Sequence, residues 1–174
     1  IQDPANGLDQ IPQSGEVRFD HVNFHYDTDG SGETLADIDF TAKSGEVVAV
    51  VSSTGGGKST LVNLIPRLYD VKDGSVSVGG HDVREYKLDT LRDAIGVVLQ
   101  KNVLFSGSIA DNIRWGKPDA TQDEIEAACK AAQAHDFIMK FPEGYNTLIE
   151  QGGSNVSGGQ RQRLCIARAL PKNP

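Results

Sequence analysis

Cysteine and long apolar runs are both scarce in this chain, and each shortage excludes a class of protein. The 174 residues hold two cysteines, Cys129 and Cys165, and no Cys-x-x-Cys pair. Both lie among apolar neighbours, so we expect buried free thiols in a reducing compartment. No uninterrupted apolar run approaches the roughly 18 residues of a membrane-spanning helix. We expect no export leader either, because residues 1–7 are polar.

An excess of positive charge is also lacking. The formal net charge is −7 and the isoelectric point is about 5.0, which argues against nucleic acid or an anionic membrane surface as the main partner. A nucleotide is not excluded, because local donors rather than global charge would hold it. With 38% hydrophobic residues, the chain is long enough to form one globular domain with a real core.

The most informative stretch is residues 52–60, which read Ser-Ser-Thr-Gly-Gly-Gly-Lys-Ser-Thr. An apolar run at 47–51 precedes it and another at 61–65 follows, so we predict a buried strand, a glycine-rich turn and the start of a helix. This is the context of a phosphate-binding P-loop, in which glycines let backbone N–H groups surround an anion. Lys58 would reach the terminal phosphates, and the Ser59 hydroxyl would join a Mg²⁺ ion.

The predicted nucleotide-binding residues of this loop share one short segment. They are Ser52, Thr54, Gly55, Gly56, Gly57, Lys58, Ser59 and Thr60. Ser52 stands where the pattern has its first glycine, and a left-handed backbone there would be unfavourable for serine. The alternative interpretation is a glycine-rich strand-to-helix turn without a ligand.

The rest of the chain predicts an α/β core with a helical insert. Residues 1–15 have the composition of a linker. Near-alternating apolar residues predict strands around 17–24 and 35–40 with a loop at 27–32 between them. A short strand at 76–78 and a buried strand at 95–99 follow. The helical insert extends from about 107 to 155.

Two predicted helices begin with capping signals. Thr121 with Glu124 three residues later is typical of a capping box. Ser157 is a good N-cap for a helix from about 157 to 170. The segment Ser157-Gly158-Gly159-Gln160 could bind an anion through the exposed N–H donors of this helix start, although a plain capped helix is the alternative.

A P-loop followed about a hundred residues later by Val156-Ser157-Gly158-Gly159-Gln160 resembles the ATP-binding domain of ABC transporters. The resemblance covers nearly the whole chain. It implies, over residues 16–174, a P-loop NTPase core of the RecA-like α/β class. Such a core has a mainly parallel sheet, an N-terminal antiparallel β section and a helical insert.

The same resemblance gives roles to further residues. Tyr26 lies where the family places an aromatic ring that stacks on adenine, although a half-buried strand residue is the alternative. Gln100 matches the Q-loop glutamine, which implies a catalytic residue that contacts the metal or the attacking water. Residues 102–116 look like the exporter branch. Residues 150–153 resemble the exporter loop that senses the membrane domain, with a plain surface turn as the alternative.

The resemblance also implies ligands and partners. ATP and Mg²⁺ would bind between two ATP-binding domains stacked head to tail, with Ser157, Gly158, Gly159 and Gln160 facing the partner's ATP. The transmembrane domain of an exporter would be the other partner, which implies a cytoplasmic location at the inner face of the membrane.

We expect three catalytic elements of the family to lie beyond residue 174: the metal-orienting aspartate, the catalytic glutamate and the switch histidine. The domain is therefore expected to be incomplete at the C-terminus. Whether this chain itself hydrolyses ATP is left open. The alternative function is a non-catalytic ATP-binding or regulatory fragment that pairs with an intact domain. A P-loop kinase or GTPase is disfavoured, because those families lack Ser-Gly-Gly-Gln at a helix start and no Asn-Lys-x-Asp motif is present.

Overall fold

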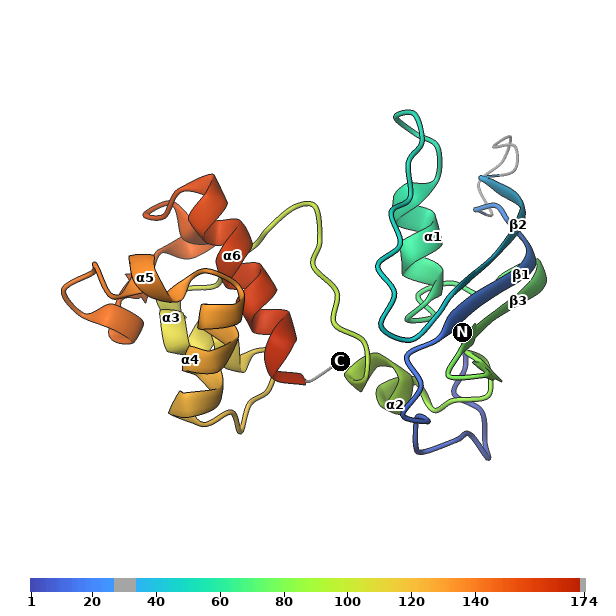
Figure 1. Cartoon of the computed structure of the whole chain (residues 1–174), viewed down its shortest axis with the longest axis horizontal. Helices are drawn as coiled ribbons and strands as arrows, with labels where there is room; N and C mark the ends of the chain where they lie inside the picture. The colour runs from blue at the N-terminus through green and yellow to red at the C-terminus, as the bar shows by residue number, and fades with distance from the viewer. Residues whose placement is uncertain (27–33, 173–174) are drawn as a thin grey trace. The chain divides into compact units, whose positions relative to one another are not determined.

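The computed structural model describes residues 1–26 and 34–172. They form two compact units, Ile1–Arg92 and Asp93–Pro174, which are described separately (Figure 1). The loop predicted at 27–32 lies outside the described residues. The predicted division into a linker, a domain and a helical insert stays a prediction.

The first unit is built on an antiparallel sheet with the strand order β2-β1-β3-β4. Its strands are β1 (Val17–Phe24), β2 (Leu35–Ala42), β3 (Asp73–Val78) and β4 (His81–Asp82). On β1, Phe19 pairs with Phe40 of β2 on one side and with Val76 of β3 on the other. Phe19 and Val76 are buried, as alternating apolar residues on one face of a sheet should be. The predicted antiparallel section is therefore confirmed.

Two helices complete this unit, α1 (Lys58–Leu64) and α2 (Leu88–Asp93). Figure 1 shows α1 on one side of the sheet, with Leu61 and Leu64 buried. The helix begins after Gly57, where a Cβ atom would lie 2.7 Å from Cδ2 of Leu35 and 2.9 Å from the carbonyl oxygen of Thr34. Glycine at this position therefore lets the start of α1 approach the start of β2 closely.

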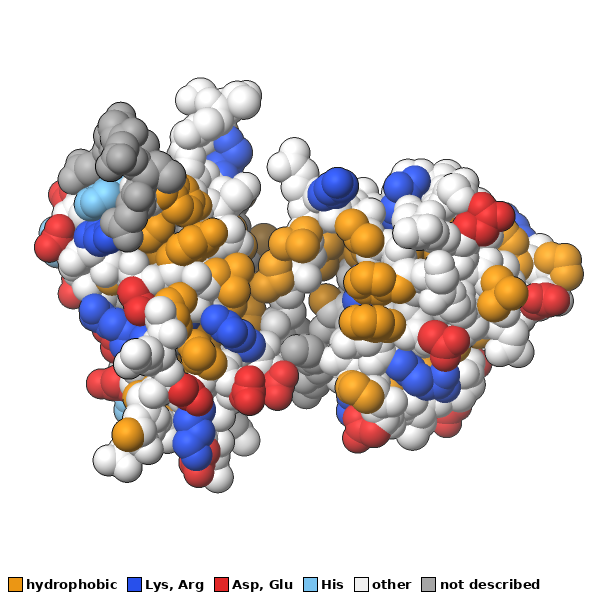
Figure 2. Space-filling model, turned by 180° about the vertical axis from the view of Figure 1, so that it is seen from behind, with side chains coloured by type: hydrophobic (Ala, Val, Ile, Leu, Met, Phe, Trp, Pro, Cys, Tyr) orange, Lys and Arg blue, Asp and Glu red, His pale blue; other side chains and the backbone are white. Residues whose placement is uncertain are grey.

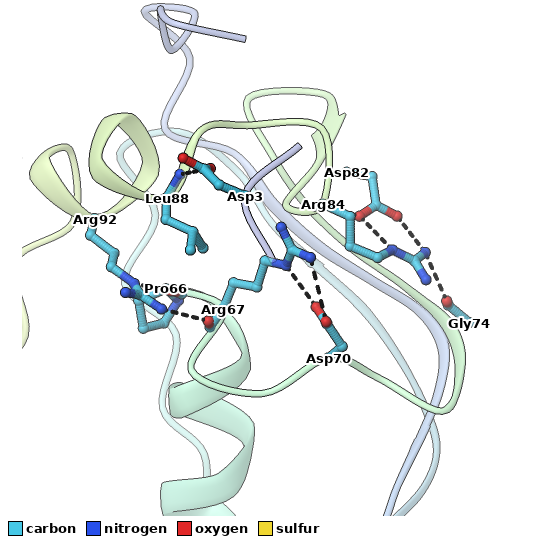
Figure 3. Close-up of polar contacts among 9 residues, drawn as sticks. All are labelled: Asp3, Pro66, Arg67, Asp70, Gly74, Asp82, Arg84, Leu88 and Arg92. Atoms are coloured by element: carbon cyan, nitrogen blue, oxygen red, sulfur yellow. Dashed lines mark hydrogen bonds and ion pairs between the residues drawn. The ribbon is translucent and has the colours of Figure 1, made fainter. Parts of the chain in front are cut away.

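Arginine side chains fix the segment that follows α1 (Figure 3). Arg92 of α2 donates from Nε to the carbonyl of Pro66 at 3.1 Å and from Nη2 to the carbonyl of Arg67 at 2.9 Å. Arg67, buried and with a left-handed φ of 50°, pairs with Asp70 at 2.6 Å. These contacts tie the C-terminal end of α1 to α2.

The N-terminal segment is bound to the start of α2. The carboxylate of Asp3 accepts the backbone N–H of Leu88 at 2.9 Å, as Figure 3 shows. Further along, the N–H of Leu8 donates to the carbonyl of Glu85 at 2.8 Å, and the carbonyl of Leu8 accepts from Lys87 at 3.0 Å. Residues 3–8 are thus held by backbone groups about 80 residues away in the sequence.

The second unit is mainly helical. Its elements are β5 (Gly107–Ser108), α3 (Ile109–Arg114), α4 (Gln122–Ala131), α5 (His135–Ile138), β6 (Leu148–Ile149) and α6 (Gly158–Ala169). Short 3₁₀ turns occupy Gly144–Asn146, Gln151–Gly153 and Leu170–Lys172. Helices α3 and α4 pack against α6 (Figure 1), and their apolar faces share one buried core. The predicted capping box of Thr121 and Glu124 is present at the start of α4.

Two predicted strands do not form. Residues 47–51 and 95–99 have no strand conformation, and Val47 and Val51 are 96% and 92% exposed. A buried strand needs backbone partners at both edges and side-chain contacts on both faces. Within its own unit, neither segment joins a described sheet. Both units accordingly present hydrophobic side chains at the surface, which Figure 2 shows in orange.

Both cysteines are buried and free, as predicted. Burial raises the pKa of the Cys129 thiol to about 11. In the part of the chain that the structure describes, no helix is long and apolar enough to cross a membrane.

Candidate functional site

The side chain of Lys58 folds back into the loop that precedes it. Its Nζ donates to the carbonyl of Ser52 at 2.9 Å, to the Ser52 hydroxyl at 3.0 Å and to the carbonyl of Ser53 at 2.9 Å. An ammonium group has three donors, and all three meet oxygen atoms of the loop. The cation is therefore held at the loop, where a phosphate oxygen could replace these acceptors.

The turn between Ser52 and Lys58 needs its glycines. Gly55 and Gly57 adopt left-handed φ angles of 82° and 78°. At Gly56 a Cβ atom would lie 2.5 Å from the Ser52 hydroxyl oxygen. Glycine is thus required for backbone conformation at two positions and for space at the third.

Ser52 does not carry the backbone strain that the P-loop pattern suggested. The φ angle of Ser52 is not positive. The left-handed conformations of this turn lie instead at Gly55 and Gly57. The Ser52 hydroxyl occupies the space over Gly56 and accepts from Lys58. Sequence reasoning missed this interaction, because the pattern records only that a glycine is replaced.

Tyr26 lies beside α1. Its hydroxyl is hydrogen-bonded to the hydroxyl of Thr60 at 2.9 Å. Its ring meets Phe24 and Tyr69 edge-on, with centroids 5.0 Å and 5.2 Å away. A cavity of about 530 Å³ adjoins these rings and is also lined by Leu68. The structure thus brings predicted residues Tyr26 and Thr60 together and adds Tyr69, which no local pattern in the sequence singles out.

The predicted signature segment begins α6 in the second unit. The Ser157 hydroxyl accepts the N–H of Gln160 at 3.2 Å, and the Gln160 side chain accepts the N–H of Ser157 at 2.9 Å. These two bonds form a capping box. Gly158 and Gly159 are exposed, and a Cβ atom at either would meet nothing within 4 Å. Packing within this unit therefore does not require the glycines, which leave the helix start open to close approach from outside.

The two predicted metal-binding side chains are both exposed. Ser59 is the second residue of α1, and Gln100 follows the segment 95–99 in the second unit. Within residues 1–26 and 34–172, no group of three or more His, Cys, Asp or Glu residues could hold a metal ion. Mg²⁺ in nucleotide sites commonly takes only one or two protein ligands together with phosphates and water. The Ser59 hydroxyl and the Gln100 amide are oxygen donors of the kind that such a site uses.

A comparison with models of known protein families identifies the family of this chain. The family model described as ABC transporter matches residues 35–174, which include the glycine turn and the start of α6. The chain belongs to the ABC transporter family. This membership confirms the resemblance seen in the sequence and the predicted fold class, a P-loop NTPase fold of mixed α/β content.

The relatives of this ABC chain are exporter-type proteins. YgaD of Bacillus subtilis, whose name describes an ATP-binding/permease protein for multidrug export, is 49% identical over 172 residues. A Staphylococcus aureus protein with the same description is 46% identical over 175 residues. Each match covers 99% of this chain and 30% of the relative. The chain therefore spans about a third of the length of these exporters and corresponds to their ATP-binding domain.

A solved structure agrees with this placement. A bacterial Atm1-family ABC exporter with ATP bound superposes with a TM-score of 0.93 and is 39% identical. The match covers 100% of this chain and 30% of the exporter chain.

Proposed function

We propose that this chain binds ATP with Mg²⁺ as the ATP-binding domain of an exporter. The observation that carries the proposal is the position of Lys58, which points into a turn that only glycines at 55 and 57 allow. A lysine there can exchange loop oxygens for charged phosphate oxygens, and such charge-assisted hydrogen bonds are about twice as strong as neutral ones. The ATP-bound exporter structure supports the same ligand.

The residues around this lysine would each contact a different part of the nucleotide. Lys58 would bind the terminal phosphates, while the N–H groups of residues 54–60 would bind phosphate oxygens along the turn. The Tyr26 ring would stack on the adenine. The Ser59 hydroxyl would be a Mg²⁺ ligand in this unit, where the ion would neutralise charge on the phosphates. The role of Gln100 as a metal ligand is proposed from the family resemblance alone.

The start of α6 would serve a second ATP-binding domain. Gly158 and Gly159 leave backbone N–H donors uncovered, and the capping box fixes Ser157 beside them. We propose that Ser157, Gly158, Gly159 and Gln160 bind the terminal phosphate of ATP held by a partner domain stacked head to tail. The other proposed partner is the transmembrane part of a multidrug-type exporter, which would put the domain at the cytoplasmic face of the membrane.

Lys58→Ala tests the proposal. A ligand that binds only the folded chain stabilises it by about 2.7 kcal/mol at 100 times its Kd, so ATP with Mg²⁺ should raise the melting temperature of the unaltered chain. Lys58→Ala should lose that shift. Lys43→Ala, at an exposed lysine just after β2, is the matched control and should keep it. An undiminished shift in a folded Lys58→Ala variant would refute the assignment.

A further inference from the structure

One hydrogen bond joins two parts of the proposed site that lie 34 residues apart. Tyr26 follows β1, and Thr60 is the third residue of α1. Their hydroxyls are 2.9 Å apart. Thr60 is only 6% exposed, so water has little access to its side of the bond. A shielded hydrogen bond of this kind can hold an aromatic side chain in one orientation.

Two neighbouring aromatic rings also restrain Tyr26. Phe24, which is buried, and Tyr69 each meet it at an interplanar angle of 88°. Phe24 and Tyr69 are themselves 5.7 Å apart, so the three rings form one cluster. Edge-to-face contacts favour this geometry. The cluster restrains the body of the ring, whereas the bond to Thr60 fixes its far end.

We propose that Thr60 is a positioning residue for Tyr26, and that their hydrogen bond holds the ring at the angle that stacks on a purine base. The proposal rests on the proposed function, in which Tyr26 meets the adenine. It links base recognition to α1, because Thr60 belongs to the helix whose first turn is the proposed phosphate site.

The expected effect follows from the fraction of chains with a correctly oriented ring. When only that fraction binds, the apparent Kd rises by its inverse. One neutral hydrogen bond contributes enough to change this fraction by roughly 2- to 10-fold. Binding of the base should change by that factor, and binding of phosphates alone should not.

The test is a double-mutant cycle on the 174-residue chain with two probes, ATP and inorganic tripolyphosphate, each titrated calorimetrically with Mg²⁺. Tyr26→Phe keeps the ring and loses the hydroxyl, so it should weaken ATP binding roughly 2- to 10-fold and leave tripolyphosphate unchanged. In a Thr60→Val background, Tyr26→Phe should have no further effect on ATP. In a Thr60→Ser background, which keeps the hydroxyl, the effect should return.

Control variants separate this proposal from the one on which it rests. Tyr69→Phe loses a hydroxyl but keeps its ring edge, and should bind ATP normally. Tyr26→Ala removes the stacking ring and should weaken ATP relative to tripolyphosphate. If it does not, the adenine-stacking role is refuted together with the positioning role. If it does, but Tyr26→Phe costs the same in the unaltered chain and in the Thr60→Val background, only the positioning role is overturned.

Discussion

Replacing Ser52 by alanine should tighten ATP binding, because the Ser52 hydroxyl competes with phosphate for Lys58. The ammonium group of Lys58 is 3.0 Å from this hydroxyl and 2.9 Å from each of two carbonyl oxygens, those of Ser52 and Ser53. Binding the terminal phosphates requires at least one of these acceptors to be exchanged. Ser52→Ala removes the side-chain acceptor in advance and leaves both carbonyls in place.

The size of the effect follows from exposure. A hydrogen bond to a charged group contributes about 1.5–3 kcal/mol when water is excluded. Ser52 is exposed, so water competes and the contribution falls to the range of a surface ion pair, about 0.2–1 kcal/mol. The Kd for ATP should therefore fall, by a factor of up to about five.

A comparison with Ser52→Gly tests the reasoning. Glycine also lacks the hydroxyl, but it adds backbone freedom that costs about 0.5–1 kcal/mol when the loop is ordered. Since Ser52 has no positive φ to relieve, glycine should bind ATP no more tightly than alanine does. Fluorescence titration with a labelled ATP analogue measures all three proteins, and Ser53→Ala, which keeps its carbonyl, is the control. If glycine alone tightens binding about tenfold, backbone strain rather than the hydroxyl limits this loop, and our account is wrong.

Three further predictions concern stability and titration. Ser157→Ala removes the cap of α6 and should lower the free energy of unfolding by about 1 kcal/mol, seen as a melting temperature lower by roughly 2–4 °C. Ser157→Asn should recover most of this stability. An unchanged melting temperature in Ser157→Ala would mean that the cap is not formed. The Cys129 thiol, whose pKa burial raises to about 11, should resist a disulfide reagent at about pH 8 and react after unfolding; labelling of the folded chain would contradict its burial. The hydrogen bond that His21 donates to the Asp37 carboxylate raises the pKa of His21, so NMR titration should give a value above the usual 6.5 that drops in Asp37→Asn. Because the pKa of His21 is raised in the folded state, its pairing with Asp37 stabilises the fold fully at pH values below the unfolded pKa. This stabilisation is lost as the pH rises through the folded pKa. An unshifted pKa of His21 would rule out the ion pair.

Signals contained within a few residues predicted the fold best. The helix beginning at Ser157 and the capping box at Thr121 were both correct, because an N-cap and its partner lie three residues apart. Alternation along 17–24 identified β1 for the same reason, since a strand's two faces can be read from its own sequence. The glycine turn and the start of α1 at Lys58 were equally local.

Features that depend on distant partners could not be predicted in this way. The apolar runs at 47–51 and 95–99 have the composition of buried strands, but a strand forms only where a neighbour supplies hydrogen bonds. The bond between Tyr26 and Thr60 joins residues far apart in the sequence. Ser52 was read as a strained glycine substitute, whereas its side chain is an acceptor for Lys58.

The attachment of residues 3–8 to the start of α2 determines how a mechanical load would enter the first unit. Tension applied at residue 1 meets the bond between Asp3 and Leu88 first, and then the two backbone bonds of Leu8. The bonds of Gly15 to the Ser44 hydroxyl and of Glu16 to the N–H of Gly79 come next, just before β1 begins at Val17. A pull from the N-terminal side would thus be borne first by the segment 85–88 and, through Arg92, by the carbonyls of Pro66 and Arg67 that follow α1. The attachments of residues 3–8 would therefore take up load before the segment next to the sheet does.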